Sequence, residues 1–170
     1  MRHLGRLLHQ TRSEHSHHTQ SQVSFESEER IKVFLAYAEE DRADVKRLFN
    51  SLRDAGLDPW MDQEKLLPGE NWPRSIERAI ESSDFFCVCF SQRSVGKLGY
   101  FQSEIRYALD IATYVPFGEI FLVPVRLGEC VVPPEITRRM QFLDLFPDWE
   151  IGVKALVSMM KGQVERRRNR

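Results

Sequence analysis

The chain has 170 residues, of which 42% are hydrophobic, and its formal net charge is −1. This length and composition predict one domain with a sizeable core. The near-zero net charge gives no general affinity for polyanions, and the longest apolar run is far too short to cross a membrane. No apolar stretch follows the basic residues at the N-terminus, so no secretory signal is predicted.

Residues 1–29 hold all five histidines and many Ser, Gln and Glu residues, without a lasting apolar period. This composition predicts a disordered N-terminal extension. The rest of the chain contains no histidine. A Ser–His–Asp or Cys–His catalytic arrangement, and a metal held by histidine, are therefore excluded from the domain itself.

The first part of the domain alternates strand and helix patterns. Residues 31–37 read as a strand, and Asp41 is placed to cap a helix that ends near Gly56. Residues 57–61 predict a second strand, and residues 62–71 predict a loop.

The middle of the chain carries the pattern that matters most for function. A helix is predicted from about Trp72, and the apolar run 85–90 predicts a fully buried strand. Residues 91–100 read as a loop, and a helical period begins at Phe101. Glu104 is predicted at the border between the apolar and polar faces of that helix, where its carboxylate would be half desolvated.

Further strands and a helix follow. Residues 120–126 predict a strand, in which Pro124 indicates a bulge or another irregularity in the ladder. Residues 141–144 predict a short last strand. A final helix is expected around residues 153–160. The basic residues within 164–170 predict a frayed tail rather than a nucleic-acid patch, because no aromatic residues interleave with them.

The alternation of strands and helices predicts an α/β fold: a flavodoxin-like three-layer sandwich with a five-stranded parallel sheet of order 2-1-3-4-5. In such sheets ligands bind beyond the carboxyl ends of the strands, where the order reverses. That crevice would be lined by residues 37–41 and 91–104, which places Glu104 in it. The chain contains no G-x-G-x-x-G motif and no P-loop, so it does not indicate the usual glycine-rich loops that bind the phosphates of dinucleotides or nucleoside triphosphates.

The three cysteines give no metal site. Cys87 and Cys89 share one face of the predicted buried strand, and no second pair or nearby histidine accompanies them or Cys130. They are predicted to be reduced thiols in the core of a cytoplasmic protein.

Four motifs together resemble those of TIR (Toll/interleukin-1 receptor) domains, in particular bacterial ones that cleave NAD+. They are KVFLAY at 32–37, WMDQEKLLPGENW at 60–72, SVGKLGYFQSEIRYALD at 94–110 and FLDLF at 142–146. The second contains the BB loop, and the third the helix that carries the family's catalytic glutamate. The resemblance covers residues 31–161 and implies a TIR domain over residues 30–163.

The resemblance implies cleavage of the nicotinamide–ribose bond of NAD+, giving nicotinamide and ADP-ribose or a cyclic isomer, in immune-type or anti-phage signalling. Glu104 matches the catalytic position, and NAD+ is the substrate, with no separate cofactor. The implied substrate-binding residues are Tyr37, Ala38, Glu39, Asp62, Lys65, Leu67, Tyr100 and Phe101. The last two stand where the family often has Trp. Self-association through the BB loop, residues 62–71, is also implied, with no nucleic-acid or membrane partner.

Two alternatives stay open. The first is a TIR interaction module without catalysis, and the second is a nucleoside deoxyribosyltransferase, which has a related fold and a catalytic glutamate. A phosphoacceptor receiver domain is excluded, since it needs an aspartate at the end of the third strand, where this chain has Ser91 after Phe90.

Overall fold

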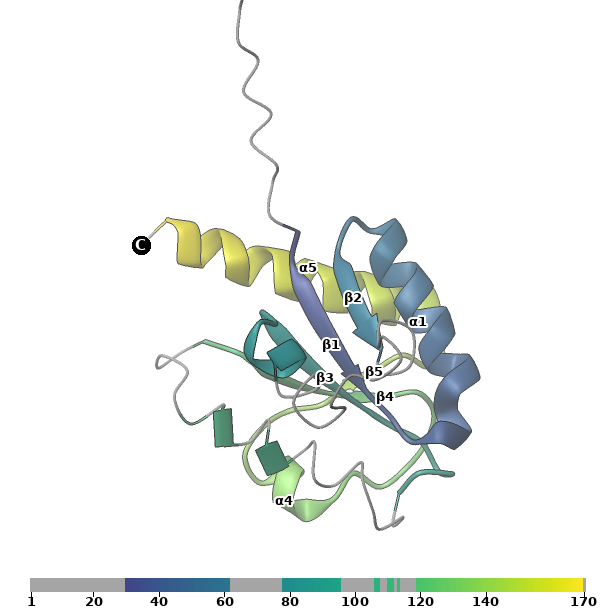
Figure 1. The fold of residues 1–170 in the computed structure, drawn as a ribbon. Helices are drawn as coiled ribbons and strands as arrows, with labels where there is room; N and C mark the ends of the chain where they lie inside the picture. Colours follow the sequence, from purple (N-terminus) through teal and green to yellow (C-terminus); the bar gives the residue numbers. More distant parts are fainter. Residues whose placement is uncertain are drawn as a thin grey trace, which may run out of the picture.

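The structure, a computed structural model, describes residues 30–61, 78–95, 106–107, 110–111, 113 and 119–169. Within these residues five parallel strands form one sheet of order β2-β1-β3-β4-β5 (Figure 1). The predicted fold class and strand order are therefore confirmed. The strands are β1 (Lys32–Ala36), β2 (Asp58–Met61), β3 (Phe85–Phe90), β4 (Leu122–Arg126) and β5 (Leu143–Asp144).

Helices cover both faces of the sheet. Among the described residues, α1 and α5 pack together on one face, and α4 lies against the other (Figure 1). The bounds are η1 (Glu39–Asp41), a 3-10 turn, α1 (Arg42–Asp54), α4 (Pro134–Thr137) and α5 (Trp149–Arg168). None of the helices in the described part of the chain is long and apolar enough to cross a membrane.

The two faces of β1 show how the sheet divides the core. Val33 and Leu35 pack into the cluster formed with α1 and α5, whereas Phe34 and Ala36 pack into the cluster on the opposite face. Side chains alternate along a strand, so both sides of a central parallel strand must be apolar. β3 follows the same rule, because all six of its residues are buried.

The start and end of α1 follow from its sequence. Val45, Leu48, Phe49 and Leu52 form its buried stripe, at the spacing of one helix face. Gly56 follows the helix with φ +87°, a left-handed conformation that glycine adopts without steric cost. The chain then enters β2, as the sequence predicted.

Pro124 does not cause the predicted bulge. The pairing of β4 with β3 is continuous from Leu122 to Arg126, and Val88 is the partner of Pro124. The Phe121 carbonyl accepts a hydrogen bond from β3, and the Leu127 N–H donates one to β3. The backbone polar groups of successive residues in a strand point to opposite sides, so the nitrogen of Pro124 points away from β3. On that side, the pairing with β5 begins only at Val125. The missing N–H therefore faces a position without a ladder partner, and the strand stays regular.

Two segments differ from their predictions. The short helix α4 was not foreseen, because a four-residue helix has no apolar period to detect. α5 continues to Arg168, so residues 164–168 are helical where the sequence predicted a frayed tail. The helix expected from Trp72 is described only at its end, and that expected from Phe101 only at residues 106–107 and 110–111.

Candidate functional site

The carboxyl ends of β1 and β3 meet where the strand order reverses. β1 ends at Ala36 and pairs with β3, which ends at Phe90. The segments that follow, residues 37–41 and 91–95, therefore leave the sheet at the same edge. This is the position at which open parallel α/β sheets bind their ligands, so these segments form one wall of the candidate site.

Asp41 ties the two segments together. Its side chain is fully buried, and Oδ1 accepts hydrogen bonds from Ser91 Oγ at 2.6 Å and from Arg93 Nε at 3.1 Å. Asp41 does occupy the N-cap position of α1, but its side chain makes no capping bond. The prediction of a capping role was wrong, because the carboxylate turns toward the loop after β3 instead.

The loop after β3 is held by a compact serine turn. The backbone N–H of Ser91 donates to Ser94 Oγ at 2.9 Å, and the backbone N–H groups of Ser94 and Val95 donate to the Ser91 carbonyl at 3.2 and 3.1 Å. The N–H of Arg93 donates to Ser91 Oγ at 3.0 Å. Both serine side chains are buried, so these bonds fix the path of residues 91–95 as the chain leaves β3.

Arg93 places a cation at this edge. Its guanidinium donates to the carboxylates of Asp44 and Asp41, and these hydrogen bonds, that of Asp44 first, raise the pKa of Arg93. Glu39 lies on the same segment and is paired with Arg42 at 3.3 Å on the surface. The described wall therefore carries an arginine held between carboxylates, not an isolated positive charge.

The sequence-predicted residues of this wall are placed differently from one another. Tyr37 is buried and belongs to the core cluster of α1 and α5. Ala38 is buried at the start of η1, so its backbone is what it offers to a ligand, and Glu39 is exposed. The remaining predicted residues, Asp62, Lys65, Leu67, Tyr100, Phe101 and the catalytic candidate Glu104, lie outside the described residues.

Sequence reasoning missed the contacts of Asp41, Ser91 and Arg93. They join positions 50 and 52 residues apart, which no local pattern indicates. The sequence did offer a signal for the turn itself. Ser91 and Ser94 stand directly after a buried strand, at a spacing that suits a turn held by hydrogen bonds between serine side chains and the backbone.

The cysteines are unsuited to chemistry at neutral pH. Cys87, Cys89 and Cys130 are free and buried, and burial raises the pKa of each thiol. The thiols are therefore protonated and poor nucleophiles. In the described part of the chain, no group of His, Cys, Asp and Glu side chains could hold a metal ion.

A second ionic cluster stabilises the neighbouring strand ends. Arg126 of β4 forms a bidentate pair with Asp144 of β5, with both oxygens at 2.6 Å, and also donates to the Cys130 carbonyl at 3.0 Å. Its guanidinium lies over the rings of Phe142 and Phe146, at 4.3 and 5.1 Å. The residues of the FLDLF motif therefore gather around one arginine at the edge of the sheet.

The fold defines a doubly wound α/β protein, with the candidate site at the switch point between β1 and β3. A sequence model of the family described as "TIR domain" matches residues 33–157. The chain therefore belongs to the TIR domain family.

Curated relatives match over a shorter stretch. The chain is 42% identical over 60 residues to NAD(+) hydrolase PdTIR of Paracoccus denitrificans, covering 35% of this chain and 20% of that protein. It is 34% identical over 61 residues to the probable 2' cyclic ADP-D-ribose synthase TcpO of Methanobrevibacter olleyae, covering 35% and 18%. The chain thus spans about a fifth of the length of the curated relatives it matches.

Solved structures show the same fold. The TIR domain of the Toll-related receptor TRR-2 from Hydra magnipapillata superposes with a TM-score of 0.61 at 22% identity. That likeness covers 76% of this chain and 97% of that one. At this identity the likeness shows the fold alone.

Proposed function

We propose that this TIR domain cleaves the bond between nicotinamide and ribose in NAD+, with Glu104 as the catalytic residue. The observation that carries the proposal is the likeness, within one family, to two relatives whose names state an NAD(+) hydrolase and a probable cyclic ADP-ribose synthase. Glu104 supports it from the sequence, because it matches the position of the family's catalytic glutamate early in the helix predicted from Phe101.

The reaction requires only one catalytic carboxylate. Bond cleavage passes through an oxocarbenium-like transition state, as glycoside hydrolysis does. Nicotinamide leaves as a neutral pyridine, so no general acid is required. The Glu104 carboxylate would accept hydrogen bonds from the ribose hydroxyls and stabilise the developing positive charge. Water then adds to the anomeric carbon and loses a proton to give ADP-ribose, or a nucleophile of the same molecule closes a cyclic product.

The remaining groups would position the dinucleotide. In this proposal the segment from Tyr37 through Ala38 to Glu39 contacts the substrate beside Glu104. The BB loop closes over it with Asp62, Lys65 and Leu67, and Tyr100 or Phe101 stacks on a ring of the substrate. Arg93 lies at the same edge, where its ion pairs with Asp41 and Asp44 hold the loop after β3 in place.

The two alternatives make different predictions. An interaction module without catalysis would leave NAD+ intact, and a deoxyribosyltransferase would exchange the bases of deoxynucleosides. The test is incubation of the purified chain with NAD+, and separately with a deoxynucleoside and a free base, followed by mass spectrometry of the products. The proposal expects nicotinamide with ADP-ribose or a cyclic isomer. Intact NAD+ at high protein concentration would contradict it.

A further inference from the structure

We propose that Asp41 is a positioning residue for the reaction: it fixes the segment that would contact the substrate relative to the segment that leads into the helix predicted to carry Glu104. This inference rests on the proposed function. The first segment, residues 37–41, follows β1, and the second, residues 91–95, follows β3. Both leave the sheet at the switch point, so their relative position shapes the candidate site.

Asp41 is anchored in its own segment before it reaches across to the other. Its backbone N–H donates to the Ala38 carbonyl at 2.8 Å, and η1 runs directly into α1, whose apolar side is packed on the sheet. Across the switch point, Asp41 Oδ1 accepts hydrogen bonds from Ser91 Oγ at 2.6 Å and from Arg93 Nε at 3.1 Å. The fully buried carboxylate therefore holds the turn after β3 against the start of α1.

The helix predicted to carry Glu104 is held independently beyond that residue. Its described positions, 106–107 and 110–111, are helical, and Tyr107 and Ile111 pack against the core cluster on the face that α4 covers. Tyr107 Oη also donates to Glu81 Oε1 at 2.7 Å. Because these contacts fix the later part of the helix, a displacement of residues 91–95 has to be absorbed by the residues in between, which include Glu104.

Such a displacement would affect the rate more than binding. Residues 37–41 would stay anchored on α1, so their contacts with the substrate would be retained. The Glu104 carboxylate is needed chiefly in the transition state, where the ribose becomes charged. We therefore expect Asp41→Ala to lower kcat by about 10- to 100-fold, the cost of misplacing a catalytic group by about 1 Å, with a small change in KM. A purely structural Asp41 would lower stability and leave the kcat of the folded protein unchanged.

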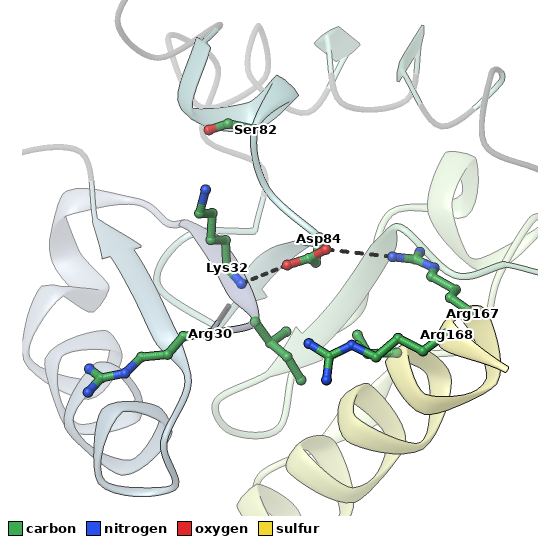
Figure 2. A pocket seen from close by; sticks show the side chains of 8 residues that line it. Arg30, Lys32, Ser82, Asp84, Arg167 and Arg168 are labelled. Atoms are coloured by element: carbon green, nitrogen blue, oxygen red, sulfur yellow. Dashed lines mark hydrogen bonds and ion pairs between the residues drawn. The ribbon is translucent and has the colours of Figure 1, made fainter. Parts of the chain in front are cut away.

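The opposite edge of the sheet offers a matched control. Asp84 Oδ2 accepts a hydrogen bond from the backbone N–H of Lys32 at 2.8 Å, and Oδ1 lies 3.8 Å from Arg167 Nη1 (Figure 2). Lys32 begins β1 and Asp84 directly precedes β3, so this carboxylate joins the same two strands at their other ends. Asp84→Ala should therefore lower the free energy of unfolding and leave kcat and KM unchanged.

Asp41→Asn separates position from stability. Within the described residues, Asp41 Oδ2 is buried and has no hydrogen-bond partner. An asparagine can keep its oxygen in the place of Oδ1 and still accept from Ser91 and Arg93, while its amide N–H groups take the place of Oδ2 without a partner. A buried donor without a partner lowers stability. Asp41→Asn should therefore be destabilised, yet keep a kcat closer to the parental value than that of Asp41→Ala.

The test is steady-state NAD+ turnover by the full chain, by both Asp41 variants and by Asp84→Ala, at a temperature at which melting curves show each to be folded. A fall in kcat for Asp41→Ala that Asp41→Asn partly restores and Asp84→Ala does not share would support the inference. Equal kcat in Asp41→Ala and Asp84→Ala would overturn it. If Asp41→Ala is poorly folded, Ser91→Ala, which removes one of the two bonds, replaces it with a smaller expected loss of kcat.

Amide hydrogen exchange distinguishes failure of this inference from failure of the proposed function. The N–H groups of Ser94 and Val95 donate to the Ser91 carbonyl, and they should exchange at least about tenfold faster in Asp41→Ala than in the parental chain. In Asp84→Ala their exchange should be unchanged. A parental chain that leaves NAD+ intact would overturn the proposed function, and the exchange would still decide whether Asp41 holds the turn. Unchanged exchange in Asp41→Ala would overturn the inference whatever the activity.

Discussion

Asp41 joins two loops of the candidate site that are 50 residues apart in the sequence. A fully buried carboxylate is costly unless hydrogen bonds compensate for its lost hydration. Ser91 provides a short bond to Oδ1, and Arg93 provides a charged one. Within the described residues, Oδ2 has no hydrogen-bond partner. The position of the loop after β3 therefore depends strongly on the two bonds that are made.

Ser91→Ala tests this dependence. The change removes the hydroxyl that donates to Asp41, so the free energy of unfolding should fall by about 1.5–3 kcal/mol, the range for a bond to a charged group. Urea unfolding measures it. The control is Ser51→Ala, whose hydroxyl donates only to the Arg47 carbonyl of its own helix at 3.0 Å. A loss for Ser91→Ala no larger than that for the control would contradict the role assigned to Asp41.

α5 lies unusually close to β5 at Gly152. A Cβ built on Gly152 would come within 2.6 Å of the Asp144 carbonyl oxygen and 2.7 Å of Leu145 Cα. Both are backbone atoms, so neither can turn aside. Glycine is thus required at this position by the contact between the helix and the strand end.

Gly152→Ala should therefore push α5 away from the sheet and lower the free energy of unfolding by about 1–3 kcal/mol, the usual cost of overpacking. Gly162→Ala is the matched control in the same helix. Its Cβ would meet only the Arg166 side chain, at 3.7 Å, so that change should raise stability by about 0.5–1 kcal/mol. The melting temperatures of both variants check the prediction. A change of the same sign and size in both would contradict it.

The strands and long helices could be predicted because their apolar periods are local. β3, for example, was predicted with its observed bounds from six consecutive apolar residues. The serine turn and the burial of Asp41 could not be predicted, because they depend on contacts between distant positions. Pro124 shows a related limit: its effect depended on where β5 begins to pair, which the residues around the proline do not reveal. Glu104 was singled out from its helical position and from the family resemblance, and its role stays a prediction.

The chain matches only about a fifth of the length of its curated relatives. We propose that copies of this chain associate through the BB loop, residues 62–71, and that a neighbouring copy completes the candidate site. The domain boundaries at residues 30 and 163 also stay predictions.

If association completes the site, activity on NAD+ should be weak in dilute solution and should rise more than in proportion to protein concentration, or when a crowding agent is added. Nicotinamide release measured across a dilution series, with light scattering on the same samples, checks this. A constant specific activity over a range in which the molecular mass changes would rule out completion of the site by a neighbour.

The central claim is that Glu104 stabilises the positive charge that develops on the ribose of NAD+. Its most direct test is the turnover of Glu104→Gln, compared with Glu165→Gln, which makes the same change at an exposed position of α5. Turnover of the first variant should fall by about a hundred- to a thousandfold, with a much smaller change in substrate affinity, because only the transition state is charged there. The melting temperature should be nearly unchanged in both variants. Near-parental NAD+ cleavage by a well-folded Glu104→Gln would contradict the account.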